Sequence, residues 1–299
     1  MSVFNKYIKK NVDGHIMYLF VHDSGISSVL KVSARRVKTR EQAFMSIIRK
    51  EVVAGMTVCD VGANIGFVTL LLCRLVGKKG KVYAIEPDPN NVKLLRRNIE
   101  VNGYKDRVEI IEGCFSDRSG KIDFNLSDKF SNLGSVKHTK HSSSKIRVPS
   151  FTIDTFFAKK RGPDFIKMDV EGHEIEIIDG ALKELKRVTS TKLLIEIHPG
   201  LYDDPKAMEK RVVKLVSLGF SVKYIVTAGV RIPSLLKNRG YNKPDLSLKK
   251  YGLSDDYRRA VYSNVKNADA AYFCRPHKLW VPRKRKFGTK VLRSIMLVK

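Results

Sequence analysis

The stretch CDVGANIG, residues 59–66, decides the fold, because it joins a buried apolar run to an apolar-periodic helix. Gly62 allows the backbone to turn tightly, and Gly66 lets the start of the helix approach a ligand closely. The pattern D-x-G-x-N-x-G differs from the G-x-G-x-x-G of dinucleotide enzymes and lacks the Lys-Ser/Thr of a phosphate-binding loop. It therefore predicts a nucleoside site at the end of a buried strand.

A second acidic position supports this prediction. Glu86 ends the next apolar run, 20 residues after Gly66, where a carboxylate can accept hydrogen bonds from two ribose hydroxyls. Asp60 suits a positive or amino-bearing ligand better than a pyrophosphate. S-adenosylmethionine, a nucleoside with an ammonium and a sulfonium group and no phosphate, fits both carboxylates.

Alternation of short apolar runs with helical periods predicts an α/β domain with a parallel sheet. The expected strands are 56–61, 81–87, 107–113, 164–170, 192–199, 221–226 and 269–276. The expected helices are 64–77, 89–103, 173–185 and 205–220. Residues 118–149 read as a hairpin with a polar loop around 134–145. At the front, HIMYLFV and ISSVLKVS predict a second hairpin, followed by a helix over 39–53 that packs on the edge of the sheet.

Several segments, taken in order, resemble the FkbM family of S-adenosylmethionine-dependent methyltransferases. They are CDVGANIGFVTLLL, YAIEPDPNNVKLLRRNIEVNG, FSDRSG, DFIKMDVEGHEIEIIDGA and LLIEIHP. The similarity as a whole covers roughly residues 30–225. The resemblance implies a class I methyltransferase (Rossmann-like) fold, α/β and doubly wound, with a mostly parallel seven-stranded sheet. It also implies O-methylation of hydroxyls on sugars or natural products.

The resemblance further implies which residues hold the cofactor. Around its methionine part it places Asp60, Gly62, Asn64 and Gly66, and at the ribose Glu86. Gly113 and Cys114 would lie beside the adenine. Many methyltransferases have an Asp where Cys114 stands, so the contact to the adenine amine is expected to come from the backbone or from Ser116 and Asp117.

The predicted organisation has three parts. An N-terminal hairpin and helix (1–55) pack on a methyltransferase domain (56–276), and a basic tail follows (277–299). Four scattered cysteines suit buried thiols in a reducing compartment. No run approaches the roughly 18 apolar residues of a membrane span, and no signal peptide is evident, so a cytoplasmic protein is expected.

Two remote stretches predict the catalytic crevice. FIKMDVEGHE (165–174) places Asp169 at the end of the fourth strand, and LLIEIHP (193–199) places Glu196 and His198 at the end of the fifth. Ligands in doubly wound sheets bind beyond the carboxyl ends of the strands, so these side chains should face the methyl group together. Lys167 shares a strand face with Asp169 and is expected to pair with it and keep it ionised.

Three roles are open for this cluster. His198 or Asp169 could act as a general base on the acceptor hydroxyl. The side chains of Asp169, Glu196 and His198 could instead hold a divalent metal, or the cluster could only position the substrate. A general base is preferred and a metal is not expected.

The neighbouring residues carry weaker expectations. Glu174 is expected to complement a helix dipole, and His173 to be exposed. Possible substrate contacts are Asn132, Glu171 and His173. The segment after the fourth strand lacks the N/D-P-P-Y/F stretch of nucleobase N-methyltransferases, which favours an oxygen acceptor.

The net charge of +27 is the second guide to partners. Residues 275–299 carry nine Lys or Arg and no acid, and Val291, Ile295 and Val298 follow Phe287 near helical spacing. Such a helix could lie on an anionic membrane surface. It could also bind RNA, since Trp280 and Phe287 interleave with the charges, or it could be a solvated charge run.

The main hypothesis is an S-adenosylmethionine-dependent O-methyltransferase acting on a hydroxyl of a sugar, a glycan (lipid-linked glycans included) or a related small molecule. The charge suggests a second, an RNA ribose methyltransferase, whose RNA binding would weaken with salt. A non-catalytic module for an anionic surface is the third, and the glycine loop and Glu86 argue against it.

Overall fold

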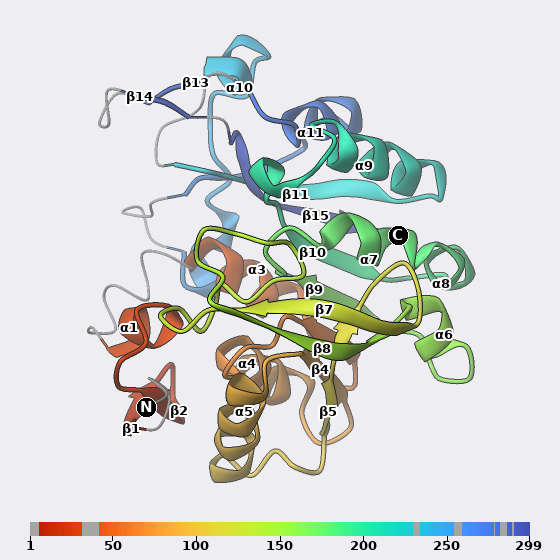
Figure 1. Cartoon of the computed structure of the whole chain (residues 1–299). Coiled ribbons are helices and arrows are strands. Elements are labelled where there is room, and N and C mark those ends of the chain that lie inside the picture. Colours follow the sequence, from red (N-terminus) through yellow and green to blue (C-terminus); the bar gives the residue numbers. More distant parts are fainter. Residues whose placement is uncertain are drawn as a thin grey trace.

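The computed structural model describes residues 6–31, 42–229, 234–253, 259–277, 279–281, 286–288 and 290–299. Its centre is an eight-stranded sheet with the order β12-β11-β15-β10-β9-β3-β4-β5 (Figure 1). These strands are β3 (Thr57–Val61), β4 (Lys81–Glu86), β5 (Val108–Glu112), β9 (Phe165–Met168), β10 (Lys192–Glu196), β11 (Ser221–Thr227), β12 (Val261–Ser263) and β15 (Leu292–Val298). The doubly wound class I methyltransferase fold is confirmed, with one strand more than expected.

Helices cover both faces of this sheet, with α3, α4 and α5 on one face and α6, α7 and α8 on the other (Figure 1). The helices are α1 (Ile26–Lys31), α3 (Gln42–Glu51), α4 (Phe67–Val76), α5 (Pro89–Val101), α6 (Ile153–Phe157), α7 (Glu174–Asp179), α8 (Leu182–Arg187), α9 (Ala207–Ser217), α10 (Ser234–Asn238) and α11 (Asn267–Phe273). Short 3-10 turns are η1 (Pro199–Leu201) and η2 (Ser247–Tyr251). The expected helix 173–185 is two helices, because it breaks at Gly180, where a Cβ would lie 2.0 Å from the Ser116 carbonyl oxygen.

The five strands β5, β4, β3, β9 and β10 are parallel neighbours. Each expected strand from 56–61 to 221–226 is confirmed to within a few residues. All five residues of β3 are buried, as required of a strand covered on both faces. The predicted hairpin is also present, as β7 (Gly120–Leu126) paired with β8 (Ser144–Phe151), and β8 also pairs with β6 (Cys114–Phe115).

The C-terminal part was predicted wrongly. The expected strand 269–276 is the helix α11, and the last strand is β15, which lies antiparallel between β10 and β11. Its residues Ser294–Leu297 are all fully buried, so this stretch reads as the continuous apolar run of a central strand. The expected amphipathic helix from Phe287 is therefore wrong, and the methyltransferase sheet extends into the presumed tail. A small hairpin, β13 (Leu279–Val281) and β14 (Lys286–Gly288), precedes β15, and the side chains of Trp280 and Phe287 lie outside the described residues.

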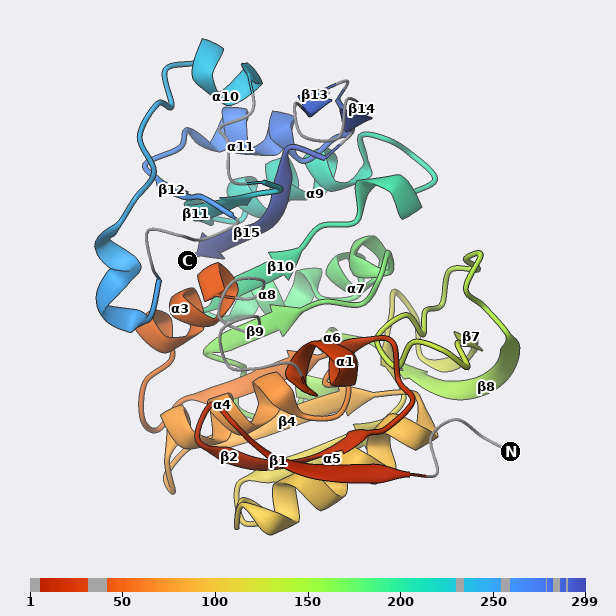
Figure 2. The same ribbon diagram turned by 90° about the vertical axis from the view of Figure 1, so that its left-hand side faces the viewer.

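The N-terminal hairpin is shifted from its expected position. It consists of β1 (Tyr7–Val12) and β2 (His15–Phe20), and Asp13 and Gly14 turn between them with φ of 52° and 81°, as in a type I′ turn. The expected second strand, ISSVLK, is the helix α1. Figure 2 shows the hairpin at the opposite end of the molecule from α10, β13 and β14.

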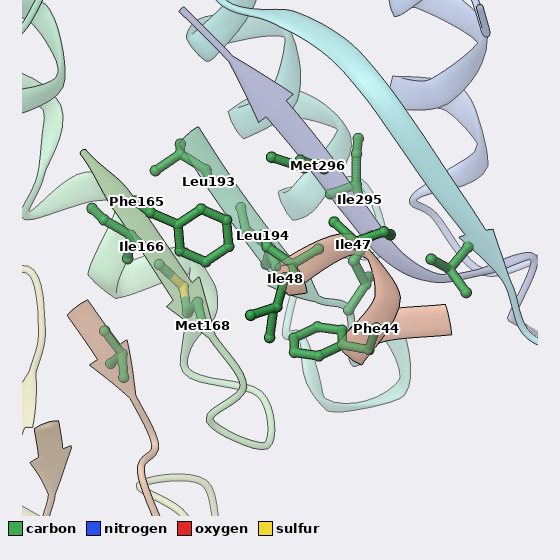
Figure 3. Close-up of a cluster of buried hydrophobic side chains, with 14 of the residues drawn as sticks. Phe44, Ile47, Ile48, Phe165, Ile166, Met168, Leu193, Leu194, Ile295 and Met296 are labelled. Atoms are coloured by element: carbon green, nitrogen blue, oxygen red, sulfur yellow. The ribbon is translucent and has the colours of Figure 1, made fainter. Parts of the chain in front are cut away.

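The N-terminal segment attaches to the domain through α5 and α3 rather than through the edge of the sheet. Asn98 on α5 accepts a hydrogen bond from the Tyr18 backbone at 2.7 Å. On α3, which lies within the expected helix 39–53 (residues 39–41 are outside the described residues), Ile47 and Ile48 are fully buried. They share one core cluster with Leu194 and Ile295 (Figure 3). Helix α3 therefore covers the face of β10 and β15.

Truncation of Ile295 tests the role of β15 in the core. Replacing a fully buried isoleucine with alanine leaves a cavity, and we expect Ile295→Ala to lower the free energy of unfolding by about 2–5 kcal/mol. The control is Val213→Ala on α9, whose side chain is 57% exposed and whose change should stay within about 0.5 kcal/mol. Urea unfolding measures both. Equal effects would mean that residues 292–298 are not part of the core.

Candidate active site

Two adjoining cavities lie beyond the carboxyl ends of the parallel strands. The first holds about 550 Å³ of empty space and the second about 1120 Å³, both including space open to solvent. Residues that line both cavities are Gly62, Asn64, Asn132, Asp169 and Glu171. A ligand in the first cavity would therefore meet a ligand in the second beside these residues.

The glycine loop separates the cavities and is tightly constrained. Gly62 has φ of 77°, and a Cβ at this position would lie 2.0 Å from the Asp169 carbonyl oxygen. Any side chain would force the loop away from the end of β9. The backbone N–H groups of Gly62 and Ala63 both donate to the Ile85 carbonyl at 3.0 Å. The turn expected at Gly62 is thus required by the packing between β3 and β9.

Lys167 contacts Asp60 and the glycine loop. Its Nζ lies 3.0 Å from Asp60 Oδ1 and donates to the carbonyls of Val61 (3.2 Å) and Gly62 (2.7 Å). Burial opposes the charge on Lys167, but Asp60 and Asp169 outweigh it and raise the pKa of the lysine. The expected direct pair of Lys167 with Asp169 is therefore replaced by a pair with Asp60. All three N–H donors of Lys167 thus have partners, and two of them hold the backbone of the glycine loop in place.

Glu86 lies at the end of β4 in the wall of the first cavity, as predicted. Its carboxylate accepts hydrogen bonds from the backbone N–H groups of Asn64 (2.7 Å) and Asp88 (3.0 Å). Burial, followed by the nearby Asp88 carboxylate, raises the pKa of Glu86 to about 7. Glu86 thus ties the glycine loop to β4 and also faces the cavity.

The opposite end of the first cavity contains Gly113 and Cys114, which the family resemblance placed beside the adenine. Ser116 is turned elsewhere. Its hydroxyl donates to Asp117 Oδ1 at 3.0 Å and lies 3.0 Å from His173 Nε2. The described wall of this cavity includes neither Ser116 nor Asp117, so the geometry favours Cys114 and its backbone over these two as neighbours of an adenine.

His198 is surrounded by carboxylates. Its Nδ1 lies 2.7 Å from Glu174 Oε1, and because a carboxylate only accepts, Nδ1 carries the hydrogen. Its Nε2 lies 3.5 Å from oxygens of Glu171 and Glu196 and 4.0 Å from Asp169 Oδ1.

Burial disfavours a charged His198, but the carboxylates outweigh it and raise the pKa of His198 well above its ordinary value. An imidazolium cannot accept a proton. The structure therefore disfavours the expected role of His198 as the base.

Asp169 and Glu196 respond in opposite ways to the same crevice. Burial and the Glu196 carboxylate raise the pKa of Asp169 to about 7. Burial also disfavours ionised Glu196, but Arg293 and His198 outweigh it and lower the pKa of Glu196 to about 2. Arg293 Nη2 lies 2.5 Å from Glu196 Oε1. Two acids with separated pKa values can take different roles at one pH.

One other expectation fails in this region. His173 was expected to be exposed, yet it is 4% exposed, and burial lowers its pKa. Glu174 lies in the first turn of α7, where an acid complements the helix dipole as expected, and it is also fully buried as the partner of His198. Asn132 lines both cavities, where a substrate contact was predicted.

Four residues that line the two cavities or hold their walls were not predicted from the sequence. They are Asp23, Asn91, Ser131 and Arg293. Arg293 was assigned to a tail, so nothing placed it beside Glu196. Asp23 was considered part of a hairpin turn. The only signal for Ser131 was its position next to Asn132, a predicted substrate contact.

A glycine loop after β3, an acid at the end of β4 and acids at the ends of β9 and β10 together define a Rossmann-like methyltransferase. The Methyltransferase FkbM domain family matches residues 60–243, which is more than half of the chain. The chain belongs to this family of S-adenosylmethionine-dependent methyltransferases.

Named relatives are more distant. The hexuronic acid methyltransferase AglP of Haloferax volcanii is 29% identical over 185 residues, 62% of this chain and 73% of its own length. The 2-O-methyltransferase NoeI of Sinorhizobium fredii is 28% identical over 147 residues, 44% of this chain and 59% of its own length. A solved FkbM methyltransferase from Methylobacillus flagellatus is 17% identical with a TM-score of 0.41, covering 70% of this chain and 43% of that one.

Glu86 provides the test of the first cavity. Glu86→Gln removes the charge that ribose hydroxyls would donate to, and we expect S-adenosylmethionine to bind about tenfold more weakly, the loss of one charge-assisted hydrogen bond. The matched control is Glu112→Gln, because Glu112 is the cross-strand neighbour of Glu86 and is 56% exposed. Calorimetric titration measures both affinities. Equal affinity of wild type and Glu86→Gln for S-adenosylmethionine would show that Glu86 does not contact the cofactor.

Proposed function

We propose that the chain transfers the methyl group of S-adenosylmethionine to a hydroxyl of a sugar or glycan. The observation that carries this proposal is the carboxylate of Asp169, which lies where the two cavities meet. A cofactor in the first cavity and an acceptor in the second would meet at this carboxylate. The names of AglP and NoeI, a hexuronic acid methyltransferase and a 2-O-methyltransferase, support a carbohydrate acceptor.

In this proposal the first cavity holds the cofactor. The ribose hydroxyls donate to Glu86, the adenine lies beside Cys114, and the methionine part follows the loop of Gly62 and Asn64. Asp60 does not contact the cofactor directly in this proposal, because it is fully buried and bound to Lys167 and Thr69. It instead holds Lys167, which supports the glycine loop.

The proposed reaction is an in-line displacement. An oxygen lone pair of the acceptor attacks the methyl carbon, the carbon–sulfur bond breaks, and its electron pair neutralises the sulfonium to give S-adenosylhomocysteine. The hydroxyl proton passes to Asp169, whose pKa of about 7 suits a general base near neutral pH. Glu196 remains ionised, and His198 and Arg293 balance the negative charge of the crevice. Glu171, which lines both cavities, is the nearest further candidate for a substrate contact.

A divalent cation is the alternative to a base. Donor atoms of Asp169, Glu196 and His198 lie within 4.8 Å of one another, so they could hold a metal that acidifies the hydroxyl. The Nδ1 contact of His198 with Glu174 would then orient Nε2 toward the ion, as carboxylates do for metal-bound histidines. The base is preferred because Arg293 and His198 already compensate Glu196.

The net charge of +27 keeps RNA as a second candidate acceptor, through a ribose hydroxyl, and an anionic membrane surface as a further partner. Of the helices in the described part of the chain, none is long and apolar enough to cross a bilayer. We place the enzyme in the cytoplasm, where it could also lie at the membrane surface.

The acceptor class and the role of Asp169 are tested together. The purified chain is incubated with S-adenosylmethionine and, separately, neutral glycosides, uronic acid glycosides and RNA, and S-adenosylhomocysteine release is measured. We expect turnover with a glycoside, and a loss of about 10²–10⁴-fold in Asp169→Asn without loss of cofactor affinity.

The control is Asp203→Asn, since Asp203 has a 90% exposed side chain. Turnover with RNA and with neither class of glycoside would identify a ribose hydroxyl of RNA as the acceptor. Full activity of Asp169→Asn would reject Asp169 as the base.

The pH dependence of the rate, measured with and without a chelator, distinguishes a general-base mechanism from a metal-assisted one. Asp169 must be ionised to accept a proton, and its pKa is raised to about 7. The rate at saturating cofactor should therefore rise with pH through about 7 and level off above it. Because Glu86 has a similar pKa, cofactor affinity is measured over the same range. Dialysis against EDTA should leave the profile unchanged, whereas a loss restored by Mg²⁺ or Mn²⁺ would assign the three residues to a metal.

A further inference from the structure

A buried carboxylate outside the described walls of both cavities connects the N-terminal segment to the first cavity. Asp23 is 2% exposed, and both of its oxygens accept hydrogen bonds. Within its own turn it accepts from the backbone N–H groups of Gly25 (2.7 Å) and Ser27 (2.8 Å). From a segment 108 residues away it accepts from Ser131, through the backbone N–H and the hydroxyl, both at 2.8 Å.

Ser131 passes this connection on to the cofactor loop. Its carbonyl accepts from Asn64 Nδ2 and Asn91 Nδ2, each at 2.8 Å. Both asparagines line the first cavity. The backbone N–H of Asn64 donates in turn to Glu86. A continuous chain of hydrogen bonds thus runs from Asp23 through Ser131 to the two sides of the proposed ribose site.

The segment that Ser131 belongs to forms the roof of the first cavity. Ser131, Asn132, Gly134 and Val136 all line it. Between β7 and β8 this segment has no helix or strand of its own, apart from one bridge between Asn125 and Ser135, so its position depends on a small number of individual backbone and side-chain hydrogen bonds.

The N-terminal turn packs directly on this roof. A Cβ at Gly25 would lie 2.1 Å from Asn132 Oδ1, and the Ser24 N–H donates to the Lys129 carbonyl at 2.8 Å.

We propose that Asp23 is a positioning residue that holds the 129–136 roof over the cofactor cavity, and that the N-terminal segment thereby sets the affinity for S-adenosylmethionine. The described wall of neither cavity includes Asp23, so it acts through Ser131. Its two bonds to Ser131 are charge-assisted, and such bonds are about twice as strong as neutral ones. Without them the roof is attached to the N-terminal turn, within the described residues, only through the Ser24–Lys129 backbone bond and the packing of Gly25 on Asn132, and cofactor binding has to order the roof residues.

The test uses the full chain and S-adenosylmethionine alone, with no acceptor. Asp23→Asn keeps the shape but removes the charge, and we expect the dissociation constant to rise about tenfold. Hydrogen exchange of the amides of residues 129–136 should become faster in the free protein. Ser131→Ala removes one of the two bonds and keeps the carbonyl, and should raise the dissociation constant about threefold.

The matched control is Asp13→Asn. Asp13 also lies in an N-terminal turn and also joins it to the domain, through Arg49 (2.7 Å) and Arg74 (3.0 Å), but it has no link to the roof. We expect a lower unfolding midpoint with an unchanged dissociation constant. If Asp23→Asn behaves like Asp13→Asn, its role is only structural and the proposal is overturned.

If Asp23→Asn does not fold, Ser131→Ala decides, and unchanged binding by it overturns the proposal. The inference rests on S-adenosylmethionine occupying the first cavity. Absence of binding by the wild-type chain would overturn the proposed function as well, whereas equal binding by wild type and variants would overturn this inference alone.

Discussion

The buried pair of Lys167 and Asp60 is the interaction on which the rest of the site depends. The two residues are cross-strand partners on β9 and β3 and are 3% and 0% exposed. Removing one partner of such a pair leaves an uncompensated buried charge, at a cost of about 3–5 kcal/mol. Because Lys167 also donates to the Val61 and Gly62 carbonyls, the pair fixes the glycine loop as well as the two strands. The glycine loop is therefore held by the charged Lys167, which donates to its carbonyls, and by Glu86, which accepts from the Asn64 N–H.

This arrangement also fixes Asp169. It follows Lys167 by two residues, and its N–H donates to the Val61 carbonyl at 3.2 Å, while its own carbonyl occupies the space that Gly62 leaves open. The glycine loop and the proposed base are thus parts of one packed unit. A side chain at position 62 would disturb both cavities together, which explains why a glycine is needed here by packing as well as by its positive φ.

The parallel core was predictable because its signals are local. The parallel strands β3, β4, β5, β9 and β10 are short, mostly apolar runs that end at or next to a glycine or an acid, and the motifs place Asp169, Glu196 and His198 at strand ends without knowledge of the fold. The failures arose where a local reading competes with a tertiary one. VLRSIMLV fits a basic helix by period, but it is a central strand because β10 and β11 leave an antiparallel position between them. The roles of His198 and Lys167 likewise depend on partners that spacing does not reveal.

The misassigned C-terminal strand also explains the chemistry of the crevice. Four carboxylates, from Asp169, Glu171, Glu174 and Glu196, converge on one imidazole, and without further cations most of them would have to bind protons. Arg293, brought beside Glu196 by β15, keeps that acid ionised. Burial and the Glu196 charge together raise the pKa of Asp169. The low pKa of Glu196 thus depends on the last strand of the sheet, and Arg293, which helps to separate Glu196 from the proposed base Asp169, lies some 120 residues from Asp169 in the sequence.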